Sequence, residues 1–133
     1  MSEQNLKTVQ EIYGAFGRGD VPAILERVTD DTEWGFNVGS SDVPWHGTFR
    51  GKQDLPRFFG AFVENVDLEA FEPRAFMDFE SHVVVHLKLA YTVKKTGKKV
   101  SEEQLQWWTL EGGKVSRLMH YEDTAQVVQA WRG

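Results

Sequence analysis

The stretch from Gln104 to Asp123 reads QLQWWTLEGGKVSRLMHYED and contains two strand-like runs joined by a Gly-Gly-Lys turn. Two adjacent tryptophans lie in the first run, and His120, Glu122 and Asp123 end the second. Side chains as large as tryptophan need apolar surface against which to bury, whereas imidazole and carboxyl groups carry proton transfer in enzymes. The hairpin is therefore predicted to form a wall of the core, a wall of a pocket, or both.

The length and composition of the chain are typical of one folded domain. It has 133 residues, of which 41% are hydrophobic and 26% charged, and we expect a single domain over residues 1–133. Aromatic residues make up 13% of the chain, including five Trp and nine Phe. That is more than a minimal core requires, and it indicates an apolar cavity.

Charge and motif content narrow the partners that we expect. The net charge of −5 argues against broad binding of nucleic acid or anionic membranes. The chain has no cysteine, which excludes disulfides and favours a cytoplasmic location; no signal peptide or membrane span is visible. There is no glycine-rich phosphate loop, GxSxG or paired acidic metal motif, so we expect no cofactor and no metal. His82 and His86 would lie about 13 Å apart on a strand, too far to share a metal ion.

Hydrophobic periodicity predicts helices and strands that are segregated along the chain. We expect a helix over residues 3–17, a shorter helix after Asp20 that buries Val28, and a third helix opened by Gly51. Residues 39–51 are predicted to be a loop, and Pro73 indicates an edge or a bulge in its strand. The predicted strands and the final helix are Thr32–Val38, Leu68–Phe79, Ser81–Val93, Val100–Leu110, Val115–Tyr121 and Thr124–Trp131. This order predicts an α+β fold.

The order of these elements, together with several short motifs, resembles the nuclear transport factor 2-like superfamily. The branch that it resembles is the SnoaL-like domains, named for polyketide cyclases and related to ketosteroid isomerases. The motifs are GRGD at 17–20, DDTEW at 30–34, WHGTFRGKQDLPRFF at 45–59, YTVKKTGKK at 91–99 and GGKVSRLMHYEDTA at 112–125. The resemblance implies a cone: a strongly curved mixed or antiparallel sheet wrapped around three N-terminal helices, with a short C-terminal helix. It also implies a homodimer formed through the outer sheet face.

The two-residue period of a strand predicts which side chains enter the cone. Trp34 and Phe36 should point inward, and Gln106 and Trp108 should share one face of the penultimate strand. On the last strand, the resemblance favours an inner face with Ser116, Leu118, His120 and Glu122, opposite Val115, Arg117, Met119, Tyr121 and Asp123. A slip of one residue would invert this assignment.

His120 is the candidate acid–base residue, because imidazole titrates near neutrality. Glu122 or Asp123 would orient it. The alternatives are that His120 only packs in the wall and that Asp123 caps the last helix by accepting from the amides of Ala125 or Gln126. We name all three side chains, His120, Glu122 and Asp123, as candidate catalytic residues.

Resemblance to the isomerases is only partial at the residues that carry their chemistry. The position that matches the catalytic base of the isomerases falls at or near Phe36, which cannot accept a proton. The position that matches the acid of their oxyanion hole falls near Gln106, and the one that matches their helix tyrosine falls near Ile12 or Tyr13. A true ketosteroid isomerase is therefore not expected. The cyclase branch uses a late acidic residue, and Glu122 or Asp123 lies in the matching segment.

The sequence supports two functions from different classes. The first is cofactor-free isomerisation, cyclisation or hydration of a small hydrophobic, oxygenated molecule; the second is a non-catalytic ligand-binding or dimerisation domain. A pocket of several hundred Å³ with His120 facing into it would favour the first, and a filled cone the second. His46 is either a ligand contact at the pocket mouth or an exposed loop residue. The candidate substrate-binding residues are Tyr13, Trp34, Phe36, His46, Phe58, Phe62, Gln106, Trp108 and Leu118.

Overall fold

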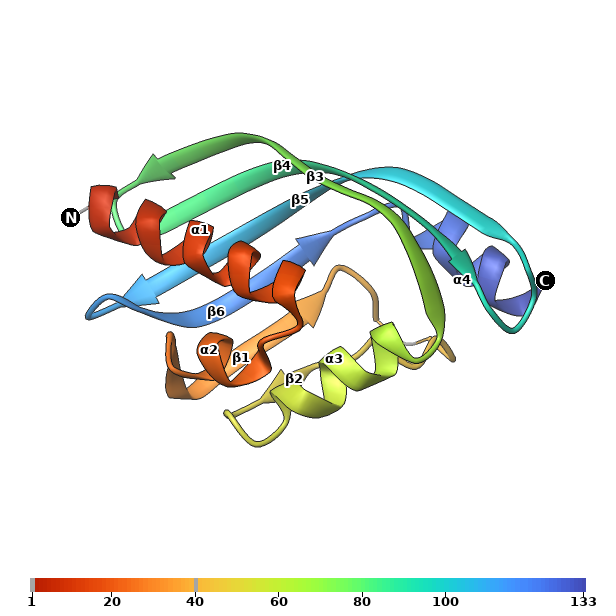
Figure 1. Cartoon of the computed structure of the whole chain (residues 1–133), viewed down its shortest axis with the longest axis horizontal. Helices are drawn as coiled ribbons and strands as arrows, with labels where there is room; N and C mark the ends of the chain where they lie inside the picture. The colour runs from red at the N-terminus through yellow and green to blue at the C-terminus, as the bar shows by residue number, and fades with distance from the viewer. Residues whose placement is uncertain (1, 40) are drawn as a thin grey trace.

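A six-stranded sheet bends around three helices in the computed structural model, which describes residues 2–39 and 41–133 (Figure 1). The strands follow the order β2-β1-β6-β5-β4-β3; β1 runs parallel to β6 and every other neighbouring pair is antiparallel. The α+β prediction is confirmed, with a mixed sheet that is not closed. The elements are α1 (Ser2–Arg18), α2 (Val21–Leu25), β1 (Val28–Phe36), β2 (Phe49–Arg50), α3 (Leu55–Val63), β3 (Val66–Phe79), β4 (His82–Val93), β5 (Lys99–Glu111), β6 (Lys114–Tyr121) and α4 (Thr124–Arg132).

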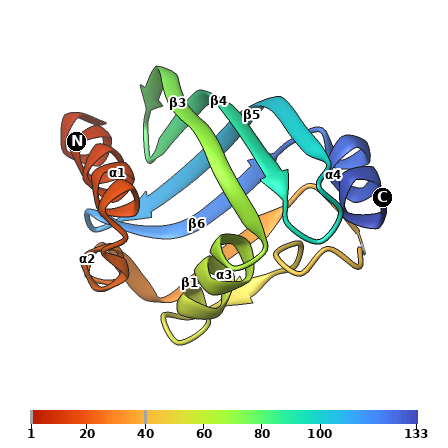
Figure 2. The ribbon, with the colours of Figure 1, turned by 45° about the vertical axis from the view of Figure 1, so that its right-hand side comes forward.

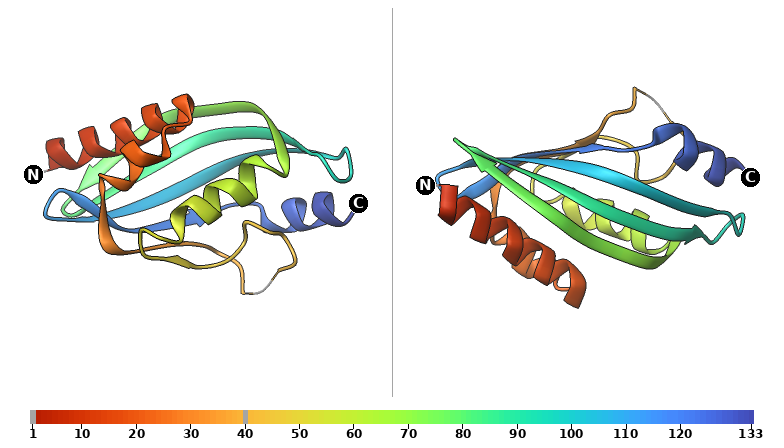
Figure 3. Two further views of the ribbon diagram at one scale, coloured as in Figure 1. Left: turned by 60° about the horizontal axis from the view of Figure 1, so that its bottom comes forward. Right: turned by 90° about the horizontal axis from the view of Figure 1, so that it is seen from above.

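The first three helices lie on the concave side of the sheet, whereas α4 lies at one end of it (Figures 2 and 3). Gly112 and Gly113 form the turn between β5 and β6, and both have positive φ, 58° and 82°. Glycine adopts this left-handed conformation at little cost, and paired positive φ values suit a tight hairpin. The turn predicted from the sequence is thus confirmed, and it brings β5 and β6 into register at the centre of the sheet.

Alternation along β5 separates the two faces as predicted. Trp108 is buried, with 2% of its surface exposed, whereas Trp107 is 39% exposed. Gln106 and Leu110 are also buried, and Leu105 is exposed. The hairpin therefore sends its two tryptophans to opposite sides of the sheet, because neighbouring side chains on a strand point in opposite directions.

One part of the predicted alternation on β6 is wrong. Val115 was expected on the outer face, but it is fully buried. The pairing shifts from Thr109 opposite Arg117 to Leu110 opposite Val115, which leaves Ser116 as an extra residue on β6. Such a bulge returns the preceding side chain to the inner face. The alternation holds beyond the bulge, where Leu118 and His120 are buried.

Two predicted boundaries are also wrong. Val28 begins β1 rather than ending a helix, because it pairs with Val115 on β6. The predicted loop over 39–51 contains the short strand β2, in which Phe49 pairs with Trp34. The prediction for Pro73 is confirmed, since β3 is an edge strand whose register shifts between Pro73 and Ala75.

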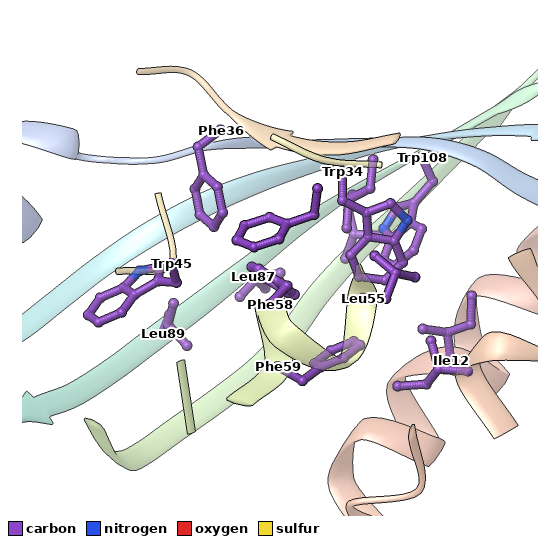
Figure 4. Close-up of a cluster of buried hydrophobic side chains, with 14 of the residues drawn as sticks. Ile12, Trp34, Phe36, Trp45, Leu55, Phe58, Phe59, Leu87, Leu89 and Trp108 are labelled. Carbon is purple, nitrogen blue, oxygen red and sulfur yellow. The ribbon is translucent and has the colours of Figure 1, made fainter. Parts of the chain in front are cut away.

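Aromatic side chains fill much of the space between sheet and helices (Figure 4). Trp34 contacts Trp108 edge-on, with ring centroids 5.4 Å apart and planes at 85°. Phe58 and Phe59 of α3 contact Trp34 from the helical side at 5.9 and 5.7 Å. Edge-to-face pairs add about 0.5–1.5 kcal/mol each beyond the burial of their area, so this network stabilises the attachment of α3 to the sheet.

No helix within residues 2–39 and 41–133 combines the length and the apolar character that crossing a membrane requires.

Candidate functional site

A cavity of about 70 Å³ lies between the concave sheet and the helices. It is smaller than the several hundred Å³ expected for an enzyme pocket, because tryptophan and phenylalanine side chains occupy much of the cone. Ten of the predicted site residues line it: Tyr13, Trp34, Phe36, Phe58, Phe62, Gln106, Trp108, Leu118, His120 and Glu122. Nine other lining residues were not predicted as site residues: Ile12, Phe16, Ile24, Trp45, Phe59, Phe71, Leu89, Tyr91 and Gln104.

Asp123 does not line the cavity. Its Oδ1 accepts a hydrogen bond from the backbone N–H of Gln126 at 3.3 Å, and its Oδ2 accepts from the Gln126 side chain at 3.0 Å. These contacts confirm the helix-cap alternative. Asp123 was predicted as a candidate catalytic residue, but it lies outside the cavity lining and its carboxylate is committed to the first turn of α4.

His46 lies behind the cavity wall and is bonded to Glu122. Its Nε2 is 2.5 Å from Glu122 Oε2, and the two side chains are only 0% and 1% exposed. The alternative of an exposed loop histidine is therefore wrong, and His46 is not among the residues that line the cavity. The adjacent Trp45, which is buried against Phe62 and Tyr91, holds the loop in this position.

The hydrogen bonds around His46 define which of its nitrogens carries the proton. Ser41 Oγ accepts from the backbone N–H of Val43 at 3.0 Å and lies 3.1 Å from His46 Nδ1. The hydroxyl can therefore donate its own proton to Nδ1, which leaves the Nε2–H of His46 to donate to Glu122. Glu122 was expected to orient His120; instead its partner is His46.

Asn37 holds the backbone of Glu122 in place. The Asn37 side chain accepts from the Glu122 N–H at 3.2 Å and donates to the Glu122 carbonyl at 3.4 Å. The Asn37 N–H also donates to the carbonyl of His120 at 3.0 Å. The end of β1 thus positions the residues that follow β6, in keeping with the parallel pairing of the two strands.

His120 is buried, lines the cavity and is oriented by the backbone. Its Nδ1 lies 2.8 Å from the carbonyl oxygen of Gly35, and its ring stacks on Phe36 with centroids 4.1 Å apart and planes at 9°. A carbonyl only accepts, so Nδ1 carries the proton and Nε2 presents a lone pair. Burial lowers the pKa of His120 to about 4, and the nearby His46 adds to the shift. The ring is neutral at pH 7 and acts as a hydrogen-bond acceptor.

A chain of hydrogen bonds crosses the cavity wall from α1 to β5. Trp108 Nε1 donates to the Tyr13 hydroxyl at 3.1 Å, and that hydroxyl donates to Gln106 Oε1 at 2.6 Å. Gln106 Nε2 then donates to Gln104 Oε1 at 2.9 Å. Burial raises the pKa of Tyr13, and the bond from Trp108 opposes the shift in part. The chain satisfies polar groups that would be costly to bury alone.

Glu102 extends this polar row beyond Gln104. It is only 4% exposed, and its Oε1 accepts from the backbone N–H of Asp123 at 2.8 Å. Burial raises the pKa of Glu102 to about 8, with a further contribution from Glu122. The pKa of Tyr91 is raised by burial first and then by Glu102 and Glu122. The inward alternation of Gln106 and Gln104, continued by two residues, would have identified Glu102 from the sequence.

The cavity therefore has two unlike ends. One end is aromatic, formed around Trp34, Phe58 and Trp108; the other presents His120, Glu122 and Tyr91. Among the residues of the described ranges, His120 Nε2 makes no hydrogen bond to the protein. The arrangement can hold a small apolar body at one end and accept a hydrogen bond or a proton from it at the other.

The chain belongs to the SnoaL-like domain family, because the family model matches residues 9–118. The matched range stops before His120 and Glu122, so the family assignment gives no information about these two residues. A comparison with curated proteins found no match.

Solved structures match over nearly the whole chain. A nuclear transport factor 2-like protein from Burkholderia xenovorans LB400 is 26% identical, with a TM-score of 0.89 over 98% of this chain and 97% of its own. TerC, co-crystallised with polyporic acid, is 22% identical, with a TM-score of 0.82 over 98% and 99% of the two chains. A protein from Mesorhizobium loti named as a SnoaL-like polyketide cyclase is 17% identical, with a TM-score of 0.73 over 86% and 96%. The last two likenesses show the fold alone.

Proposed function

We propose that this protein binds a small hydrophobic, oxygenated molecule in the cavity and transfers a proton within it without a cofactor. Isomerisation, cyclisation and hydration are the reactions of this kind that the site could support. The observation that carries the proposal is the meeting of the His120 ring and the His46-bonded Glu122 carboxylate at one end of an otherwise aromatic cavity. The polyketide cyclase name of the Mesorhizobium loti neighbour agrees with this class of chemistry.

Each polar residue has a distinct role in this proposal. Glu122 takes a proton from the ligand and returns it, and His46 orients the Glu122 carboxylate through the 2.5 Å contact. His120 accepts a hydrogen bond from a ligand hydroxyl at Nε2, since its Nδ1 is committed to Gly35. We assign the proton transfer to Glu122, because His46 orients its carboxylate at the cavity wall, and the hydrogen bond to the ligand to His120.

The size of the cavity limits the ligand. One water needs roughly 10–15 Å³ of such space, so about 70 Å³ accommodates a compact molecule of about one ring. A larger ligand would have to displace aromatic side chains. An outer groove of about 680 Å³ shares four lining residues with the cavity, Tyr13, Phe16, Phe62 and Phe71, and we propose that ligands enter between α1 and β3 through this aromatic partition.

The outer sheet face supports the proposal of a homodimer. Leu105, Trp107 and Tyr121 are 43%, 39% and 42% exposed on neighbouring strands, where Leu105 pairs with Tyr121. Exposed apolar side chains that gather on one face are typical of association sites. Trp107→Glu should shift a dimer to monomer in analytical ultracentrifugation, whereas Trp107→Phe should leave it a dimer.

The small volume of the cavity favours a second function, a non-catalytic ligand-binding or dimerisation domain. In that case the aromatic residues serve mainly as a core, and the His46–Glu122 pair serves to close one end of the cone. This protein would bind ligands without exchanging their protons.

A ligand screen followed by isotope exchange separates the two functions. Monocyclic phenols and ketones are screened by thermal shift against the wild-type chain, His120→Ala and Glu122→Gln. Ligands that stabilise the protein are then incubated in D₂O, and loss of their C–H signals is followed by NMR. We expect His120→Ala to lose stabilisation and Glu122→Gln to retain binding but lose exchange. Equal stabilisation of wild type and His120→Ala would remove His120 from the site, and binding without exchange would favour the second function.

A further inference from the structure

Glu102 is a second buried carboxyl group beside the cavity that the proposed mechanism does not use. Its Oε1 accepts from the Asp123 N–H at 2.8 Å. Its Oε2 is buried and has no hydrogen-bond partner among the residues of the described ranges. A carboxylate oxygen left in this state is costly, and a neutral acid is less so. The geometry thus favours a proton on Oε2.

The surroundings of Glu102 favour the same state. Glu122 and Asp123 act on it as negative charges that raise its pKa, whereas the groups that oppose this shift, the Asp123 N–H and the Gln104 side chain, are neutral. Two nearby buried carboxyl groups cannot both ionise cheaply, so one of them retains a proton. Glu122 already receives a hydrogen bond from His46. Glu102 has only one backbone donor, so it is the member of the pair that stays protonated.

We propose that Glu102 and Glu122 act as a carboxyl pair that holds one proton at neutral pH, with the proton on Glu102, and that Glu102 is the positioning residue that keeps Glu122 ready to act. The proposal rests on the proposed function of the cavity, because Glu122 lines the cavity and Glu102 does not. Tyr91 links the two, since it lines the cavity and both carboxyl groups raise its pKa.

The proton transfer is balanced within this pair. Glu122 takes a proton from a C–H or O–H bond of the ligand, and the bonding electron pair stays on the ligand as an enolate or alkoxide. The one negative charge of the carboxyl pair thereby moves to the ligand. Return of the proton to the same or another ligand atom restores the charge to Glu122. If Glu102 were ionised, the second negative charge would oppose formation of the ligand anion.

The first experiment tests the pair without any ligand. Glutamate side-chain carboxyl carbons are labelled with ¹³C and titrated by NMR, with Glu102 assigned through its bonds to the backbone. The controls are Glu102→Gln, which keeps the acceptor for the Asp123 N–H, and Glu103→Gln on the exposed side of the same strand. We expect one carboxyl group to titrate near pH 8 in the wild type and in Glu103→Gln, and to be absent from Glu102→Gln. Titration of Glu102 below about pH 6 overturns the proposal, and this result needs only the wild-type chain.

The second experiment uses phenol as the probe and measures its stabilisation of the protein between pH 6 and 9. We expect the wild type to lose most of the phenol-induced shift above pH 8 and Glu102→Gln to keep at least half of it, because only the wild type gains a second charge. The same decline in both proteins overturns the role of Glu102. Absence of any phenol shift at every pH counts against the proposed function, while the carboxyl titration still decides whether the pair exists.

Discussion

The two ends of the cavity differ in what builds them. The aromatic end consists of side chains whose neighbours were set by strand alternation and helix periodicity, such as Trp34, Trp108 and Phe58. At the polar end, Glu122 from the segment after β6 lines the cavity, and His46 from a loop and Glu102 from β5 lie behind it. The difference teaches that packing of the first kind follows from local sequence periods, whereas the polar end depends on a few specific contacts between distant segments.

The largest expected effect is at the aromatic end. Trp108 is 2% exposed and contacts Trp34 and Tyr13, so Trp108→Ala should reduce the free energy of unfolding by about 3–5 kcal/mol. Trp107→Ala, on the opposite face of the same strand, should cost less than half as much. Urea denaturation measures both variants, and similar losses would contradict the assignment of the two faces.

Breaking the polar pair should have the next largest effect. Glu122→Ala or His46→Ala leaves one buried partner uncompensated and should cost about 3 kcal/mol. The double substitution should cost less than the sum of the two single ones, because it leaves no buried partner uncompensated. Additive losses in a double-mutant cycle would show that the 2.5 Å contact contributes no coupling.

Stability should depend on pH in opposite directions at two residues of the polar end. The folded pKa of Glu102, about 8, is above its ordinary value, so its contribution is present below about pH 4.5 and is lost as pH rises to 8. The folded pKa of His120, about 4, is below its ordinary value, so its contribution is present above about pH 6.5 and is lost as pH falls to 4.

Variants separate these two dependences. Glu102→Gln should remove the loss of stability between about pH 4.5 and 8, and His120→Asn should reduce the loss as pH falls from about 6.5 to 4, each by at least about 1 kcal/mol. Chemical denaturation at fixed pH values measures the effect. An unchanged pH profile in Glu102→Gln would show that Glu102 is not the group responsible for the loss of stability as pH rises to about 8.

The smallest effect should come from Asp123, which lies just outside the polar end. Asp123→Ala removes the cap of α4 and should cost about 1 kcal/mol, whereas Asp123→Asn should cost less because its amide oxygen still accepts. Neither variant should alter ligand binding in the thermal-shift screen. A selective loss of binding in Asp123→Asn would return Asp123 to the site.

The residues that sequence reasoning placed correctly share one property, a regular period. Trp34, Phe36, Gln106, Trp108, Leu118 and His120 all follow a two-residue alternation, and each lines the cavity. The errors arose where the period is interrupted. The bulge at Ser116 places Val115 on the inner face instead of the outer one. The pairing of Val28 with Val115 begins β1 at a residue that was predicted to be helical.

The partners of the polar residues could not be predicted by the same route. His46 and Glu122 are 76 positions apart, and no local pattern connects a loop histidine with a residue beyond β6. Whether Glu122 or Asp123 faces the cavity depended on the direction of the backbone after β6. That direction turns the Asp123 carboxylate toward α4. The volume of the cavity depended on how far the aromatic rings interlock.

The amino-acid sequence by itself determined the α+β class, the order of the elements and the inward faces of β1 and β5, because hydrophobic periods and turn residues act over short distances. Its motifs also carried the resemblance to the SnoaL-like family, to which the chain belongs. Only the tertiary structure decided that His46 pairs with Glu122, that His120 is held by Gly35, and that Glu102 lies buried beside them. These relations arise from the parallel pairing of β1 with β6 and from the packing of the β1–β2 loop, and both join segments that are far apart in the chain.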